Sequence, residues 1–168
     1  AGTTLDLYYA AFRVPDILFV SIASIVSISV LIPLIIEKLE RDKSEAKDFI
    51  NNVFSFFFLT IGFFAVIAFI FAPDLMRWIF PNFVELSDFN SLVSLTRVLL
   101  LSPIFLGFSN LLASVTQVYK RFFVYAMSPV VYNVGIIIGI IFFYPIWGLM
   151  GLGFGVILGA FFHFAIQF

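Results

Sequence analysis

The sequence has no cysteine and a single histidine, His163, among its 168 residues. The absence of cysteine excludes disulfide bonds, thiol catalysis and cysteine-ligated metal sites, and one imidazole cannot form a metal-binding cluster. Charged residues make up only 11% of the chain, and the net charge is −1. Because there is no basic arm and no aromatic RNA-binding motif, no nucleic acid partner is expected. The sequence predicts no catalytic residues, no metal and no cofactor.

Apolar residues dominate the composition of the chain. They account for 62% of the chain, which includes 25 phenylalanines, and the mean hydropathy is +1.14. A soluble domain of this size cannot hide so much apolar surface, so the composition indicates an integral membrane protein. The apolar runs are continuous, whereas membrane β-barrels alternate polar and apolar residues. The sequence therefore predicts an all-α fold, a polytopic bundle of transmembrane helices in one membrane domain.

Charged and turn-forming residues divide the apolar runs. The loop 37–48 carries four bases and five acids and is predicted to be a solvated connector without a site. The segment after Pro73 is predicted to form an interfacial elbow with a surface pair between Asp74 and Arg77. Tyr144–Gly148 interrupts the last apolar stretch. Five spans follow, at about residues 4–36, 49–73, 92–119, 122–143 and 148–168.

The distribution of basic residues predicts the orientation of these spans. The loops after the first and third spans hold most of the bases, and the positive-inside rule places these loops in the cytoplasm. The chain is therefore expected to start outside, cross five times and end inside. No basic region with a cleavage site precedes Asp6, which leads us to expect an upstream helix and a longer parent protein. The bases in the loops after the first and third spans are Lys38, Arg41, Lys43, Lys47, Lys120 and Arg121.

The first span combines an uncharged run with a polar stripe. Residues 17–36 contain no charge and form a helix of roughly 30 Å, the thickness of a hydrocarbon core. Asp6, Arg13 and Asp16 precede this run. On an ideal helix Arg13 lies about 20° from Asp6, and Ser24 returns to the line of Asp6. In lipid, such a stripe must face protein or a water-filled cavity.

A simpler interpretation of the same residues stays open. Asp6, Arg13 and Asp16 can form an outer cap that is wet at the headgroups and only anchors the helix. Pro15 lies between the last two, and a helix break there would invalidate the angular relationship. Arg13 and Asp16, three residues apart, are spaced to form an ion pair on one face.

The later spans carry small residues at helical spacing. One stripe in the third span indicates either a helix-packing seam or a cavity wall; it contains Ser102, Leu106, Ser109, Ala113 and Thr116. Glycines spaced GxxxG in the last two spans predict a close approach between helices; they are Gly135 and Gly139, then Gly151, Gly155 and Gly159.

Two further polar residues lie within these spans. Asn133 is expected to be buried at membrane depth and so to need a partner, either on another helix or on a substrate. His163, near the end of the last span, is expected to snorkel to the interface or to pack against a neighbouring helix.

Several stretches resemble the MurJ (MviN) family of bacterial lipid II flippases. They are GTTLDLYYAAFRVPDILF and VLIPLI in the first span, APDLMRWIFPNF after the second, and LTRVLLLSPIFLGFSNLLASVTQVYKRFFVYAMSPVVYNVGIIIG across the next two. Their order and spacing agree with the family from Gly2 onward. The family belongs to the MOP exporter superfamily, whose members are built from two six-helix lobes around a central cavity. By this resemblance the chain is similar to helices two to six of the first lobe.

The resemblance implies a function. It implies transport of the undecaprenyl-diphosphate-linked peptidoglycan precursor by alternating access, in the bacterial inner membrane, by a multi-pass transporter and not an enzyme. Asp6 matches the aspartate of the family's TDAF-like motif, Arg13 the basic residue before the helix-two proline, and Asn133 the asparagine of helix five. The implied partners are this lipid-linked precursor, membrane lipid and the missing remainder of the same chain.

The chain also departs from the family pattern. Where many members carry Asn after the helix-two proline, then a basic pair and a Glu-Gly, this sequence has Asp16, Phe19-Val20 and Ser24-Ile25. A flippase for another polyprenyl-linked saccharide and a drug or ion antiporter therefore stay open as alternatives. An integral-membrane enzyme is the alternative from a different class, but the uncharged helices offer no acid–base or metal constellation.

Overall fold

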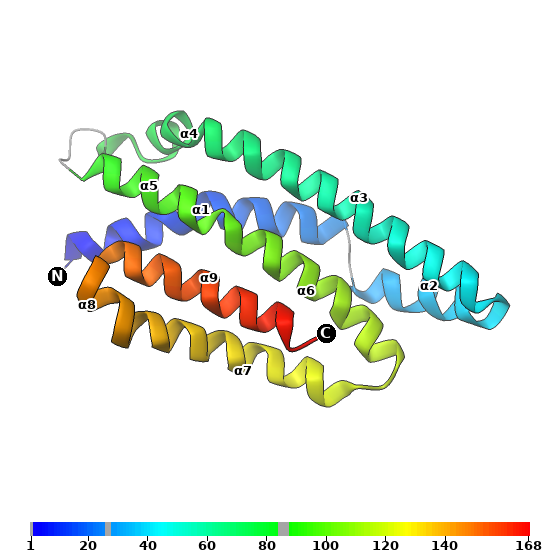
Figure 1. Cartoon of the computed structure of the whole chain (residues 1–168). Helices are drawn as coiled ribbons and strands as arrows, with labels where there is room; N and C mark the ends of the chain where they lie inside the picture. Colours follow the sequence, from blue (N-terminus) through cyan, green and yellow to red (C-terminus); the bar gives the residue numbers. More distant parts are fainter. Residues whose placement is uncertain (1, 26–27, 84–87) are drawn as a thin grey trace.

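The computed structural model describes residues 2–25, 28–83 and 88–168, and these are helical apart from short connections (Figure 1). The prediction of an all-α helix bundle is confirmed for these residues. In chain order the elements are α1 (Gly2–Ile25), α2 (Ile28–Arg41), α3 (Lys43–Ile70), α4 (Ala72–Ile79), the 3-10 turn η1 (Pro81–Phe83), α5 (Phe89–Leu99), α6 (Leu101–Val118), α7 (Phe122–Ile138), the π-helical turn η2 (Gly139–Phe143), α8 (Tyr144–Trp147) and α9 (Leu149–Ala165).

Three helical stretches are long and apolar enough to cross a membrane. They are Lys43–Ile70, Phe89–Val118, which joins α5 and α6, and Phe122–Trp147, which joins α7, η2 and α8. A shorter apolar helix, Leu149–Ala165, follows them. The segment predicted as the first span lies in two helices, α1 and α2, on either side of residues 26–27. Where the membrane meets each helix stays a prediction.

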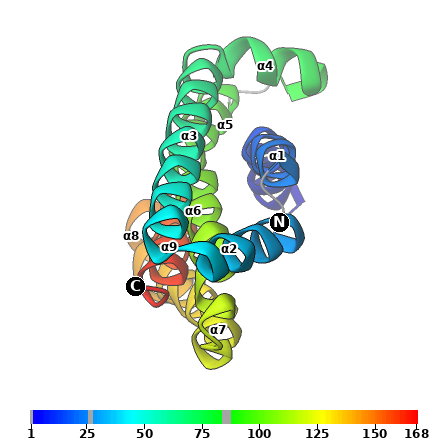
Figure 2. The ribbon, with the colours of Figure 1, turned by 90° about the vertical axis from the view of Figure 1, so that its right-hand side faces the viewer.

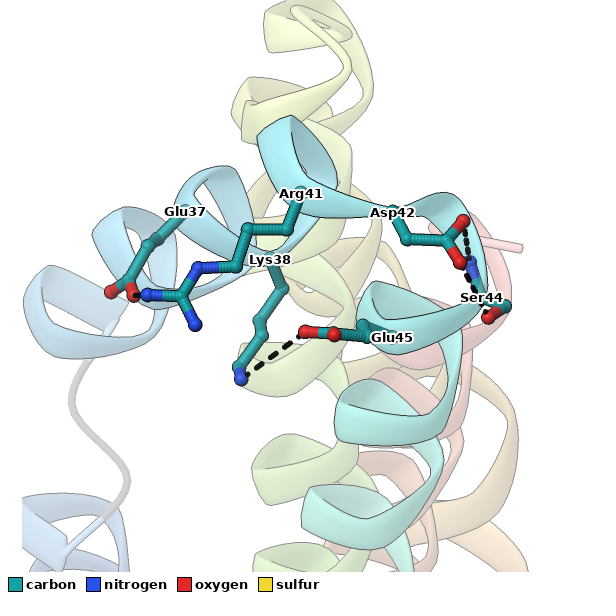
Figure 3. A network of polar contacts seen from close by, with 6 residues as sticks. All are labelled: Glu37, Lys38, Arg41, Asp42, Ser44 and Glu45. Carbon is teal, nitrogen blue, oxygen red and sulfur yellow. Dashed lines mark hydrogen bonds and ion pairs between the residues drawn. The ribbon is translucent and has the colours of Figure 1, made fainter.

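The α2–α3 connection is a capped turn of charged residues (Figure 3). Asp42 is the N-cap of α3 and accepts hydrogen bonds from the Ser44 amide at 3.1 Å and the Ser44 hydroxyl at 3.0 Å. The hydrogen bond from the Ser44 backbone N–H, more than any other interaction, holds the pKa of Asp42 below its ordinary value. Ion pairs at 2.7 Å between Arg41 and Glu37 and at 3.5 Å between Lys38 and Glu45 surround this cap. The geometry fits a solvated connector.

The elbow after α3 presents polar and aromatic side chains to the surface. Pro73 lies in the first turn of α4, where its missing N–H costs no hydrogen bond. The predicted surface pair between Asp74 and Arg77 is confirmed, with 3.5 Å between Oδ1 and Nη1. Trp78 is 83% exposed, as expected for a side chain at the headgroup level.

Glycines allow α7 and α9 to pack almost backbone to backbone. A Cβ atom on Gly139 would fall 2.4 Å from the Cα of Gly155, and one on Gly135 would fall 2.3 Å from the Cα of Gly159. The close approach predicted from the GxxxG spacing is therefore confirmed. The turn between α8 and α9 is at Gly148, whose φ of 56° suits glycine, and it lies within the interruption expected from the sequence.

Two apolar clusters hold the bundle together. The first lies where α1, α5 and α9 meet and includes Leu7, Leu99 and Val156. The second joins α2, α3 and α6 through residues such as Ile35 and Phe57. In the view of Figure 2, α1 and α7 are outer helices, and both contact α6. This arrangement leaves one face of α1 without neighbours among the described helices.

Candidate functional site

The free face of α1 carries the charged residues singled out from the sequence. Asp6, Arg13 and Asp16 are all exposed. The opposite face buries Leu7, Ala11 and other small or apolar residues, and it packs on α5 and α6. Pro15 lies inside α1 without ending the helix, so the helical register continues from Arg13 to Asp16. The three charges therefore form one exposed stripe, which we call the α1 stripe.

The α1 stripe is predicted to continue at Ser24. Ser24 belongs to α1, but its side chain lies outside the described residues, as do those of all residues from 23 to 28. The deeper part of the stripe therefore stays a prediction.

Arg13 and Asp16 are neighbours without a close ion pair. Among the described residues no ion pair within 4.0 Å and no hydrogen bond engages the Arg13 guanidinium. Asp16 nevertheless lies within electrostatic range of Arg13. Arg13 thus presents its five N–H donors in a fixed fork, the geometry that suits carboxylate and phosphate groups.

α7 contributes residues to the same region. Tyr132 lies within electrostatic range of both Asp16 and Tyr8 of α1. Neither tyrosine stands out in the sequence. The position of Tyr132 beside Asn133 was the available signal, but it does not reveal which helix the ring faces.

Asn133 has no partner on another helix among the described residues, and its expected place at membrane depth stays a prediction. Asn133 is exposed, and its Nδ2 donates to the Pro129 carbonyl of its own helix at 2.8 Å. The reason is geometric: α9 packs on the Gly135 face of α7, and Asn133 lies about 200° around the helix from Gly135. Its side-chain oxygen and second N–H remain available on the outer surface of α7.

Comparison with known proteins decides the family. The family profile described as "Lipid II flippase MurJ" matches residues 1–168. The chain belongs to the MurJ family. It is 29% identical over its whole length to a probable lipid II flippase MurJ of Borreliella burgdorferi, covering 33% of that protein. A relative with the same name in Buchnera aphidicola is 28% identical, again over the whole chain, with 34% of that protein covered.

A third MurJ relative extends the same result. The protein of Rickettsia prowazekii, also called a probable lipid II flippase MurJ, is 31% identical over 79% of this chain and 26% of its own length. The chain thus spans about a third of the length of the MurJ relatives that it matches along its whole length.

A second polar cluster in this MurJ-family chain was missed by the sequence analysis. Ser109 of α6 lies 2.5 Å from Nδ1 of His163 of α9 and donates to the His163 carbonyl at 2.9 Å. Gln167 Nε2 donates to the Ser109 hydroxyl at 2.5 Å, and Gln167 is only 5% exposed. The ring of His163 packs edge-on against Tyr132, with 6.2 Å between centroids. His163 is therefore a packing residue.

This second cluster joins α6 to α9 and the residues after it. The four-residue spacing of His163 and Gln167 on one face of the chain's last segment was the signal that could have revealed it. The small-residue stripe of α6 supplies its partner, and Ser109 within that stripe is completely buried. Among the residues that the structure describes, no three His, Asp or Glu side chains are placed to hold a metal ion.

Proposed function

We propose that this chain is part of a flippase that moves lipid II, the undecaprenyl-diphosphate-linked peptidoglycan precursor, across the bacterial inner membrane by alternating access. The match of the MurJ profile to all 168 residues carries this proposal. The names of the three relatives support it. In this proposal the chain supplies helices two to six of the first lobe, acts as a transporter and not as an enzyme, and works only with the rest of the longer protein.

The α1 stripe is our proposed contact for the diphosphate. A diphosphate needs charge-assisted hydrogen bonds when it leaves water for a cavity of low dielectric constant. Arg13 offers unengaged donors on an exposed face, and Asn133 of α7 offers an amide on the outer surface of the neighbouring region. Arginine is the side chain best matched to phosphate because its planar fork binds two oxygens at once.

The carboxylates of the α1 stripe have a complementary role in this proposal. An arginine without a counter-charge is costly at membrane depth. Asp16 lies within electrostatic range of Arg13, and Asp6 shares its face two turns away. We propose that both carboxylates balance the guanidinium while no diphosphate is bound, and that Ser24 extends the polar surface deeper into the cavity.

Complementation tests the substrate and the site together. The gene for the full-length protein is introduced into a bacterium depleted of its own lipid II flippase. We expect wild type to restore growth and Arg13→Ala to fail at equal membrane expression. Arg77→Ala is the matched control, because Arg77 is an exposed arginine already paired with Asp74, and it is expected to restore growth.

The other outcomes distinguish an error in the proposed substrate from an error in the proposed contact residue. Growth with Arg13→Ala would retain lipid II as substrate and reject Arg13 as its contact. Failure of the wild type despite good membrane expression would reject lipid II. That result would favour another polyprenyl-linked saccharide, or a drug or ion, as the transported molecule.

A further inference from the structure

A groove of about 590 Å³ runs between α3, α5, α6 and the start of α9. It is separate from the α1 stripe, since no α1 residue lines it. Its wall is apolar apart from Arg97 and Ser94 of α5 and the backbone. The α3 side of the wall includes Phe58, Gly62, Val66 and Phe69.

Arg97 is fixed at one end of this groove. Its Nε donates to the Phe69 carbonyl at 3.0 Å, and its guanidinium carbon lies 5.0 Å from the centre of the Phe69 ring. The Phe69 carbonyl is one of the last four of α3, which have no partner within the helix. Among the described residues the two terminal nitrogens of Arg97 make no hydrogen bond. A positioned cation with free donors therefore lies against an apolar groove.

The groove has a cation at one end and an apolar wall along its length, which complements the headgroup and acyl chain of a lipid. From Phe69 to Phe58 it follows α3 for 11 residues, or about 16 Å. This distance is about half of a 30 Å hydrocarbon core and so matches one leaflet. The cationic end lies beside the elbow that holds the exposed Trp78, a side chain suited to the headgroup level. Charge at the surface and apolar wall below it are the arrangement that an acyl chain with a phosphate headgroup requires.

We propose that this groove binds one anionic phospholipid of the surrounding membrane, with its phosphate on Arg97 and an acyl chain along α3. Arg77, at the same end of the bundle, is already engaged, because it pairs with Asp74 at 3.5 Å and lies over the Phe89 ring. The bound lipid is a resident of the membrane and not the transported precursor. The proposal therefore holds whether or not the full protein flips lipid II.

Native mass spectrometry of the full-length protein tests whether the charge of Arg97 contributes to lipid binding. The purified protein is titrated with phosphatidylglycerol, and bound lipid is counted for wild type, Arg97→Gln and Arg77→Gln. Removal of one phosphate-contacting arginine is expected to weaken the first binding step about fivefold. The Arg77→Gln control is expected to bind as the wild type does. Equal affinity in wild type and Arg97→Gln would overturn the proposal.

Gly62 allows an independent test of the groove itself. A Cβ atom on Gly62 would meet no heavy atom within 4 Å, so a leucine there enters the groove without displacing backbone. Gly62→Leu is expected to weaken phosphatidylglycerol binding, whereas Gly62→Ala is expected to leave it unchanged. Unchanged binding in Gly62→Leu would overturn the proposal, because it would mean that the acyl chain lies elsewhere or that another segment of the longer protein fills the groove.

Discussion

The hydroxyl of Ser109 in α6 lies 2.5 Å from Nδ1 of His163 in α9, although 54 residues separate them. The same hydroxyl accepts from Gln167 at 2.5 Å and donates to the His163 carbonyl at 2.9 Å. One small side chain thus satisfies polar groups of two residues of the last segment. Buried hydrogen bonds of this kind are costly to break because the freed groups cannot reach water.

Ser109→Ala is therefore expected to destabilise the protein by about 1 kcal/mol, in the range measured for hydrogen bonds between membrane helices. The free energy of unfolding of the full-length protein in detergent measures this change. Ser102→Ala is the matched control, since Ser102 is also a buried serine of α6 but donates only to Leu99 at 2.8 Å, three residues earlier. A loss no larger for Ser109→Ala than for Ser102→Ala would contradict a role in joining α6 to α9.

Alanine is expected to have opposite effects at Gly139, which faces α9, and at Gly62 of α3. Gly139→Ala places a methyl group 2.4 Å from the Cα of Gly155, so the helices must separate, and overpacking of this kind costs about 1–3 kcal/mol. Gly62→Ala meets no atom within 4 Å and is expected to stabilise α3 by up to about 1 kcal/mol, because alanine favours the helix. Midpoints of thermal unfolding measure both. A midpoint for Gly139→Ala at or above that of wild type would contradict the close approach.

Local periodicity was sufficient to predict several of these features. Glycine spacing predicted a close approach between helices, because only residues without a side chain allow it, and the structure shows that approach between Gly139 and Gly155. The placement of Asp6, Arg13 and Asp16 on one face also followed from the helical period, which continues through Pro15. These features depend on the sequence of a single helix.

Features that depend on which helices are neighbours could not be predicted in the same way. The orientation of Asn133 depends on the side of α7 that α9 covers. The sequence of α7 alone does not show which side that is. The contact of Ser109 with His163 and the proximity of Tyr132 to Asp16 also join distant segments. The groove at Arg97 needs four helices at once, so no single stretch of sequence indicates it.

The cap at Asp42 predicts a pH-dependent start of α3. The amide of Ser44 lowers the pKa of Asp42, so the carboxylate stabilises the folded turn above the unfolded-state pKa. This contribution is lost as the pH falls through the lower pKa of the folded state. Hydrogen exchange of peptides from the start of α3, corrected for intrinsic rates, is expected to show steady protection above about pH 5 and a progressive loss as the pH falls below about 4. Asp42→Ala should remove this dependence and be less protected at pH 6.

Asp48→Asn is the control for this experiment. Asp48 is an exposed carboxylate of α3 that makes no hydrogen bond with described residues, and its replacement is expected to leave the pH dependence of the cap unchanged. Protection that varies equally with pH in wild type and Asp42→Ala would refute the assigned cap.

The α1 stripe can be distinguished from a simple outer cap by its accessibility to water. The chain has no cysteine, so single cysteines can be introduced at Asp6, Arg13 and Asp16 in a full-length background without other cysteines. A membrane-impermeant maleimide reacts with thiolates, which require water. Asp16 lies ten residues beyond Asp6, or about 15 Å along the helix. A cap that is wet at the headgroups predicts labelling at these three positions and none at Ser24→Cys, which lies deeper on the predicted stripe. A water-filled cavity predicts labelling at Ser24→Cys as well. Phe63→Cys, on an exposed apolar face of α3, should stay unlabelled in lipid, and its labelling would show that the reagent does not distinguish cavity from bilayer.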